Sequence, residues 1–275
     1  MSEKGYEFLI YEKKDGVARI FFNNPKKLNA MGIPMLTELR DALLDAESDD
    51  GVKVMVLSGA GDRSFSVGQD LSPAGGRGQS AESAPISRPI GTYNYLRNVC
   101  YETHRLMERM EKPIIAAVNG YCFAGGLEFA LACDFMIASE NAAFGILEVG
   151  LGILPGSGGI VRFSRAISSR KAKELLYTAG RITAKEAEAM GLVNKVVPQG
   201  QLESAVKEIT DSICAKSLLA IRLAKMVANY SLETPDIDSA LALERTACSL
   251  IQASEDSTEG ARAFMEKRPP VFKGR

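Results

Sequence analysis

The order of apolar and polar positions along the chain predicts alternating strands and helices. Val17–Phe22, Val52–Leu57 and Ser64–Val67 are short apolar runs bounded by turn residues, which is typical of strands. Between the first two runs, apolar residues recur at helical spacing on one face: Met35, Leu36, Leu39, Ala42, Leu43 and Ala46. Strand, helix, strand and short strand in this order favour an α/β fold with covered sheets.

The stretch from Pro113 to Asp134 is predicted to organise the rest of the chain. An apolar run at 114–118 passes through a small-residue turn at 124–126 and continues as LEFALAC, which indicates strand, turn and helix. The first N–H groups of a helix have no partner within it and favour developing negative charge, and glycine leaves them open to a ligand oxygen. Glu128 lies about one turn inside this apolar segment. A carboxylate beside such a turn suggests acid/base chemistry.

Two plainer interpretations of this stretch stay open. The glycines could serve only close packing of helix on strand, and Glu128 could face solvent. The turn matches neither the dinucleotide-binding glycine motif nor a P-loop, and no P-loop occurs elsewhere in the chain.

A second carboxylate, Glu148, lies in the apolar segment AAFGILEVGLGILPGSGG at 142–159. Burial without a cation raises the pKa of a carboxyl group, which helps it carry a proton near neutral pH. The alternative is a glutamate at a strand end that pairs with a distant arginine.

Two features between the strands and the central stretch have simpler interpretations. Residues 72–92 are rich in Gly, Pro, Ser and Ala, which predicts either a lid or a disordered loop. A helix with an apolar stripe then runs from Leu96 to Met110. The only histidine, His104, lies one position off that stripe, and we predict a surface or interface role for it.

The second half of the chain is predicted to be mostly helical. Ser168 begins one helix, and Thr183 with Glu186 forms a capping box for the next. Amphipathic helices follow after about residue 200 with no strand between them, and a final helix begins near Asp256. Such a helical appendage often packs on a neighbouring subunit.

Composition excludes several classes of partner and site. The net charge is −1, so no long-range field favours nucleic acid. The N-terminus has no apolar leader, and the polar residues of 113–138 disfavour a membrane span, so we expect a soluble cytoplasmic protein. Five cysteines without C-x-x-C spacing indicate buried thiols in a reducing compartment, with neither a disulfide framework nor a zinc site.

Five segments together resemble the crotonase superfamily, and its enoyl-CoA hydratase branch in particular. They are FSVGQDL, NGYCFAGGLEFALACD, AFGILEVGLGILPGSGG, ITAKEAEAMGLVNKVV and FMEKRPPVFKG, in the family's order and spacing. The resemblance implies a spiral of repeated ββα units over 1–200, which binds CoA and carries catalysis. It further implies a helical trimerisation region over 201–275, with a homotrimer or a dimer of trimers.

The resemblance also implies the roles of four residues in the hydration of an α,β-unsaturated acyl-CoA. The backbone N–H groups of Gln69 and Gly125 would form an oxyanion hole for the thioester oxygen. Glu128 would deprotonate the water that attacks C3, and Glu148 would deliver a proton to C2. Two carboxyls that share one water titrate as a coupled pair. Single-base isomerases of the superfamily generally lack one of the two glutamates.

The acyl-CoA itself is the partner that the resemblance implies, and no metal or redox cofactor is indicated. The implied CoA-binding residues lie after the first strand, around the Gln69 loop and near the C-terminus: Lys26, Lys27, Leu28, Ala30, Ser66, Gly68, Asp70, Leu71 and Lys267. Each lysine could instead serve only as solubilising charge.

One departure from the family pattern keeps other functions open. Many hydratases have Gln-Pro before the second glutamate, whereas this chain has Ile146-Leu147. The less polar wall would suit a bulky or cyclic acyl group, so a hydratase or hydrolase for cyclic or branched acyl-CoA is an alternative. A Δ3-Δ2 enoyl-CoA isomerase and a non-catalytic crotonase-like scaffold are the others.

Overall fold

The computed structural model describes residues 5–71, 91, 93–94 and 96–275. Its larger sheet has six strands in the order β1 (Leu9–Lys14), β2 (Val17–Phe22), β3 (Val54–Gly59), β5 (Ile114–Val118), β7 (Phe135–Ser139) and β10 (Lys195–Val197). Only the β1–β2 pair in this sheet is antiparallel. The predicted lid falls mainly on 72–90 and 92, which lie outside the described residues.

A second, four-stranded sheet contains the strands that follow those of the first sheet along the chain. Its order is β4 (Ser64–Ser66), β6 (Tyr121–Phe123), β8 (Ala143–Gly145) and β9 (Ile182–Thr183). The pairs β3–β4, β5–β6 and β7–β8 each place one strand in each sheet before the chain enters helical structure. This repeated course confirms the predicted spiral of ββα units.

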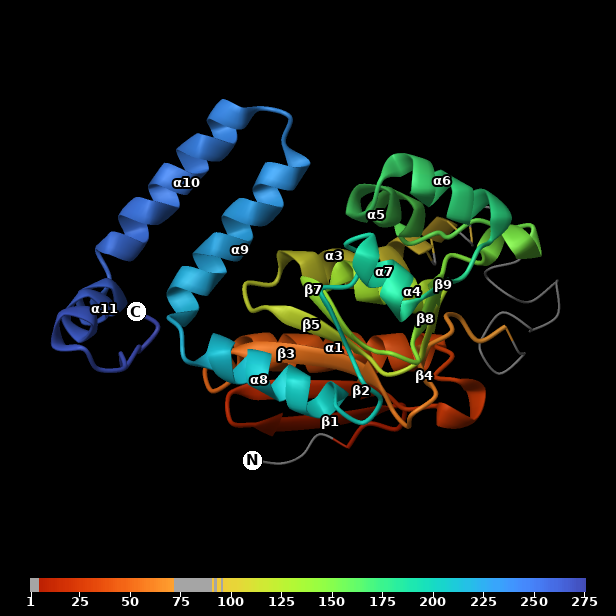
Figure 1. Ribbon diagram of the computed structural model, residues 1–275, viewed down its shortest axis with the longest axis horizontal. Helices are drawn as coiled ribbons and strands as arrows, with labels where there is room; N and C mark the ends of the chain where they lie inside the picture. The colour runs from red at the N-terminus through yellow and green to blue at the C-terminus, as the bar shows by residue number, and fades with distance from the viewer. Residues whose placement is uncertain (1–4, 72–90, 92, 95) are drawn as a thin grey trace.

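Helices cover the faces of the two sheets (Figure 1). They are α1 (Ile33–Ser48), the π-helical turn η3 (Leu96–Tyr101), α3 (Glu102–Arg109), α4 (Gly125–Ala132), α5 (Gly159–Ala166), α6 (Ser169–Thr178) and α7 (Ala184–Ala189). The described residues of this part also include two short 3₁₀ turns, η1 (Pro25–Lys27) and η4 (Glu148–Leu151). Every residue of β3 and β5 is buried, because helices or the second sheet pack on both faces.

The larger sheet separates two hydrophobic cores. The main core lies between the two sheets and the helices α1, α3, α4 and α6, and it includes Phe22, Leu39 and Phe129. The smaller core, which includes Val56 and Ile137, is covered by Val206 from α8 (Leu202–Cys214). The sheet therefore has no bare face against which the remaining helices could pack.

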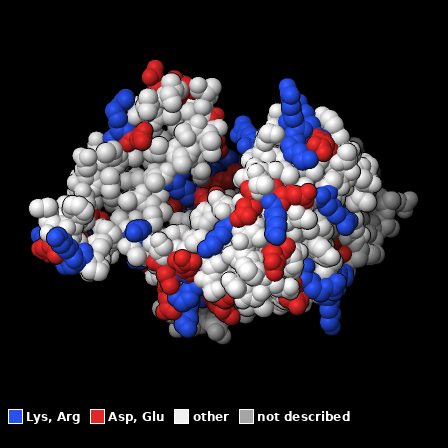
Figure 2. Space-filling view, in the orientation of Figure 1, with Lys and Arg blue, Asp and Glu red and all other residues white. Residues whose placement is uncertain are grey.

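The last three helices lie beside this body. The helices α9 (Leu218–Glu233) and α10 (Ile237–Gln252) run antiparallel, and α11 (Glu255–Glu266) follows at the far end of the molecule (Figure 1). Figure 2 shows that the surface is hollowed between the α9–α10 pair and the body. The predicted helices after residue 200 are present. The domain boundary at 200 stays a prediction, and α8, which follows it, packs on the sheet.

Some short strands were not predicted. The strand β1 carries Lys13 and Lys14 at the edge of the sheet, where charges prevent further pairing but remove the apolar alternation that identifies a strand. The strand β6 has only three residues, which is too short for a periodic pattern.

Candidate active site

A strained turn joins β6 to α4 at the predicted centre of the fold. Ala124 precedes the helix with φ 51° and ψ −128°, a conformation that costs a non-glycine residue on the order of 1–3 kcal/mol. Its N–H donates to the carbonyl of Gly145 in β8 at 2.9 Å, which holds the turn in place. Gly125 is the first residue of α4, so its N–H has no acceptor within the helix. The turn therefore leaves the N–H of Gly125 directed out of the N-terminal end of α4.

The backbone at Gln69 meets this turn. A Cβ built on Gly68 would lie 2.8 Å from the nitrogen of Gly125, and one built on Gly125 would lie 3.7 Å from the nitrogen of Gln69. Met31 donates to the Gly68 carbonyl and accepts from the Asp70 N–H, both at 2.8 Å. Because backbone groups alternate in direction along extended chain, the N–H of Gln69 points away from Met31. The structure thus brings the two predicted oxyanion donors together.

Gly126 serves helix packing, as the plainer interpretation proposed for these glycines. A Cβ at this position would lie 2.1 Å from the carbonyl oxygen of Ser66 in β4. No side chain fits there, so α4 lies directly on the strand that leads to Gln69.

Glu128 is buried, and the backbone of a distant loop binds it. Its side chain projects from the first turn of α4, and the residue is 5% exposed. Its Oε1 accepts hydrogen bonds from the N–H groups of Ser157 at 2.9 Å and Gly159 at 2.8 Å. Burial raises the pKa of Glu128, and these two bonds together with the charge of Arg162 oppose that rise. The alternative of a solvent-facing glutamate is therefore wrong.

Glu148 begins the 3₁₀ turn η4 and is 7% exposed. Its Oε2 is buried and has no hydrogen-bond partner among the described residues. Burial raises the pKa of Glu148 to about 7, and the nearby negative charge of Glu128 contributes to the rise. An ion pair with an arginine, the alternative interpretation of this glutamate, does not occur within the described part of the chain. The two carboxyls are electrostatically coupled, and one of them has a buried oxygen with no hydrogen-bond partner among the described residues.

Sequence reasoning missed the groups that hold Glu128. Ser157 and Gly159 contribute only their N–H groups, and Gly159 has to be glycine because a Cβ there would lie 2.9 Å from Oε1 of Glu128. Arg162 binds the same loop through the Ser157 carbonyl and is held by Glu108 of α3. The sequence PGSGG signals a close backbone approach, but nothing in it identifies the partner.

The predicted CoA-binding residues of the N-terminal half gather around one loop. Lys27, at the end of η1, forms an ion pair with Asp70 at 2.8 Å, which joins η1 to the Gln69 loop. Ser66 is buried and donates to the Asn29 carbonyl at 2.7 Å, and its oxygen accepts from the Gly68 N–H at 3.1 Å. These contacts shape the backbone on both sides of the oxyanion donors.

The other predicted CoA-binding residues differ in exposure. Leu28 has φ 53°, which turns the chain back after η1, and Ala30 beyond it is buried. Lys26 and Leu71 are exposed to solvent.

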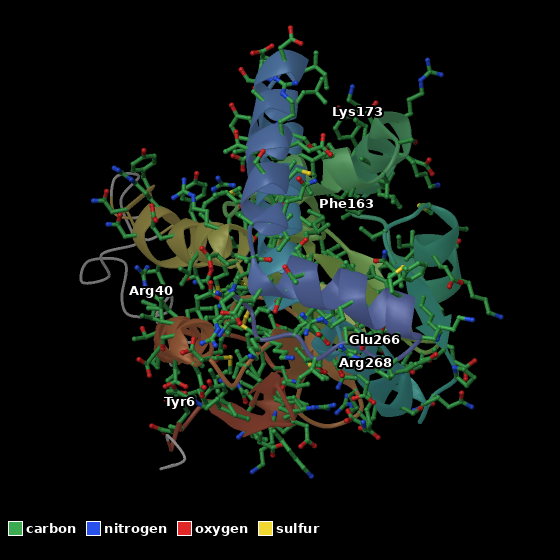
Figure 3. All side chains as sticks on the ribbon, turned by 90° about the vertical axis from the view of Figure 1, so that its left-hand side faces the viewer. Tyr6, Arg40, Phe163, Lys173, Glu266 and Arg268 are labelled. Carbon is green, nitrogen blue, oxygen red and sulfur yellow. The ribbon has the colours of Figure 1, made fainter. Side chains whose placement is uncertain are left out.

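Lys267 lies far from that loop. It follows α11, which Figure 1 places at the end of the molecule opposite β4. Its neighbours Glu266 and Arg268 lie together at the end of this helix in Figure 3, joined at 2.6 Å. Within one chain the structure does not bring Lys267 to the other CoA candidates.

His104 contradicts the surface role predicted for it. It is 1% exposed and stacks on Phe129 of α4 with ring centroids 4.0 Å apart. Its Nδ1 lies 2.6 Å from the carbonyl of Cys100, and burial lowers its pKa to about 4. His104 lies one position off the apolar stripe of α3, and its ring is still in the core because α4 packs across that side of the helix.

The described residues show neither a metal-binding cluster nor a membrane-spanning helix. Within the residues that the structure describes, no three His, Cys, Asp or Glu side chains converge as metal ligands would. No helix among them is both long and apolar enough to span a bilayer.

Comparisons with known proteins give full-length matches. The family model for enoyl-CoA hydratase/isomerase matches residues 12–275. A crotonyl-CoA hydratase of Syntrophomonas wolfei is 43% identical over 97% of this chain and 98% of that protein. A short-chain-enoyl-CoA hydratase of Clostridium acetobutylicum is 41% identical over 94% of this chain and 95% of that protein. The crystal structure of an enoyl-CoA hydratase from Bacillus anthracis has a TM-score of 0.90 at 34% identity, covering 98% of this chain and 100% of that one.

Proposed function

The chain belongs to the enoyl-CoA hydratase/isomerase family, and we propose that Glu128 and Glu148 carry its acid/base chemistry. The protein is an enoyl-CoA hydratase, a lyase that adds water to an α,β-unsaturated acyl-CoA thioester to give the 3-hydroxyacyl-CoA. The observation that supports the roles of the glutamates is the coupled, buried pair, with the Oε2 of Glu148 left without a partner in the described chain.

Glu128 acts as the base in this proposal. Its Oε1 accepts from two backbone N–H groups, so its orientation is fixed before substrate binds. The remaining oxygen holds the attacking water and takes its proton as oxygen adds to C3. The two N–H donors favour the ionised form, which a base requires.

Glu148 acts as the acid. Burial and the neighbouring carboxylate keep it protonated up to about pH 7, so it has a proton to give to C2 near neutral pH. The pair begins with one proton on Glu148 and ends with one proton on Glu128. Water relays between the two must return the proton before the next turnover.

The N–H groups of Gln69 and Gly125 stabilise the charge that develops on the thioester oxygen. As nucleophile adds at C3, electron density moves through C2 into the carbonyl to give an enolate-like state. Two fixed donors of the backbone need no reorganisation at that moment. Having glutamine at position 69 leaves this role intact, because the contact is made by the main chain.

CoA is held, in the same proposal, by the loop that contains Lys26, Lys27, Leu28 and Ala30 and by the backbone of Ser66, Gly68, Asp70 and Leu71. The Lys27–Asp70 ion pair joins the η1 turn to the loop that contains Gln69, so the two groups of proposed CoA contacts lie on linked segments. Lys267 contributes only if another chain carries it there.

The acyl group that we propose is short and linear. Relatives at 43% and 41% identity carry the names crotonyl-CoA hydratase and short-chain-enoyl-CoA hydratase. Ile146 belongs to the main core at 1% exposure, so of the apolar pair only Leu147 is placed to line an acyl pocket. The second candidate substrate has a cyclic or branched acyl group, and only the Leu147 side chain supports it.

Enoyl-CoA hydratases are generally independent of cofactors, and we propose the same for this chain, CoA being part of the substrate. We also propose a cytoplasmic homotrimer or dimer of trimers. The support is a set of exposed apolar side chains on α9, α10 and α11: Leu232, Ile237, Leu250, Phe264 and Met265, all at least 58% exposed.

Two substitutions test the roles of the glutamates. With crotonyl-CoA, Glu128→Gln and Glu148→Gln are each expected to lower kcat by about 10²–10⁴-fold, measured by loss of the absorbance of the conjugated thioester. Binding of CoA should change little. Glu140→Gln, at an exposed glutamate between them in sequence, is the matched control. Full activity in either test variant would remove that residue from the mechanism.

A further inference from the structure

Arg162 holds the peptide segment that holds Glu128. From α5, its Nη1 donates to the carbonyl oxygen of Ser157 at 2.6 Å, and its Nε donates to Oε1 of Glu108 in α3 at 2.5 Å. The Arg162 side chain is 13% exposed, so both bonds form largely away from water. The N–H of the same Ser157 donates to Glu128. One residue therefore joins the arginine to the proposed base through its own backbone.

This segment depends on side chains for its position. Residues 153–158, between η4 and α5, form neither helix nor strand, so no ladder of backbone hydrogen bonds fixes them. Gly158 has φ 101°, and a Cβ on it would lie 2.0 Å from the Nη1 of Arg162. The chain thus passes directly against the guanidinium. Moving the arginine would release the loop whose amides orient Glu128.

A second layer fixes Arg162 itself. Glu108 accepts from Arg162 with one oxygen and from Arg105 with the other, at 2.6 Å. Two bonds from one guanidinium, to a carbonyl and to a carboxylate, use the planar fork that arginine has and lysine lacks. The Asn229 side chain of α9 also donates to the Glu108 carbonyl at 2.9 Å.

We propose that Arg162, anchored by Glu108, is a positioning residue for Glu128: it fixes the Ser157–Gly159 amides and, through them, the carboxylate that activates water. This inference rests on the proposed role of Glu128. Arg162 does not touch the reacting atoms in this scheme. Its contribution is to geometry, and a displacement of the base by about 1 Å can cost about 10²-fold in rate.

The charge of Arg162 gives a second readout. Among the described residues, the charged groups that face Glu128 are Arg162 from α5 and Glu148 from η4. Arg162 lowers the pKa of Glu128, whereas burial raises it more strongly. Removing the positive charge raises that pKa further, so the acidic limb of the pH profile should move to higher pH.

The experiment compares four variants on crotonyl-CoA. Arg162→Gln removes both the positive charge and the planar guanidinium, whereas Arg162→Lys keeps only the charge. Glu108→Gln weakens the ion pair that holds Arg162. Arg165→Gln, on the exposed side of α5, is the matched control. We expect Arg162→Gln to lower kcat by about tenfold to 10²-fold with KM changed less than about threefold. Arg162→Lys should lose kcat similarly without the shift of the acidic limb. Glu108→Gln should lower kcat less than Arg162→Gln does, again with little change in KM.

A double-mutant cycle separates this inference from the proposed function. If Arg162 acts through Glu128, Arg162→Gln should cost little more in the Glu128→Gln background. An equal further loss there, or a kcat for Arg162→Gln as high as that of Arg165→Gln, overturns the positioning role. Full activity of Glu128→Gln alone overturns the proposed function instead. If Arg162→Gln does not fold, Glu108→Gln supplies the same cycle with the guanidinium in place.

Discussion

The spiral body and the C-terminal helices bury their apolar residues to very different degrees. All residues of β3 and β5 are buried, whereas α9 has no buried residue over its sixteen positions. Phe264 and Met265 of α11 are 83% and 80% exposed. The body buries a large apolar core within one chain, whereas the helical arm, defined as α9, α10 and α11, leaves large apolar side chains exposed on each of its helices.

Polar contacts link the arm to the body. Lys225 of α9 donates to the carbonyl of Lys112 at 3.0 Å and pairs with Asp134 at 2.9 Å, and Glu233 pairs with Arg105 at 2.7 Å. From this comparison we propose that the body carries catalysis and that the exposed apolar side chains of the arm serve assembly.

Blocking the oxyanion donors is the strongest test of this division. Gly68→Ala would place a methyl group 2.8 Å from the nitrogen of Gly125, so kcat should fall by about 10²–10³-fold while assembly is unchanged. Gly61→Ala is the matched control, since Gly61 also has positive φ (81° against 94°) but its Cβ would meet only Pro25, at 3.6 Å. Steady-state kinetics with crotonyl-CoA measure both. Equal activities would mean that the Gly125 N–H is not a donor to substrate.

The shared proton predicts the pH profile of the body. In the proposed mechanism the Glu128–Glu148 pair must hold one proton. Because the pKa of Glu148 is raised to about 7, kcat/KM should fall about tenfold per pH unit well above pH 7. Hydration releases no net proton, so its equilibrium constant does not depend on pH. The dehydration direction must therefore give the same limb. A flat profile from pH 6 to 9 would contradict the one-proton pair.

Removing apolar surface from the arm should change assembly before it changes catalysis. Phe264→Ser with Met265→Ser should lower the oligomer fraction in analytical ultracentrifugation and leave the fold of the body intact by circular dichroism. Tyr177→Ser on α6, 72% exposed on the body, is the matched control. An unchanged sedimentation coefficient in the double variant would show that these two side chains do not hold an interface.

Much of the body could be predicted from local pattern. The strand at 17–22 has the predicted bounds, Ser168 caps α6, and Thr183 with Glu186 forms the predicted capping box. These features depend on residues within one turn or one strand, so neighbouring positions carry the whole signal. The edge strand β1 was missed because its lysines remove the alternation that marks a strand.

The candidate site also has features that the sequence predicts and features that only the tertiary structure shows. The sequence by itself determined that two glutamates lie in apolar surroundings beside a glycine turn, and the motif order determined the family. Only the tertiary structure decided that Ser157 and Gly159 hold Glu128, that Arg162 pairs with Glu108, and that His104 is buried against Phe129. Glu108 and Arg162 are 54 positions apart in sequence. Their pairing depends on how α3, α4 and α5 pack, and a local pattern specifies which face of each helix is apolar but not which polar groups meet across it.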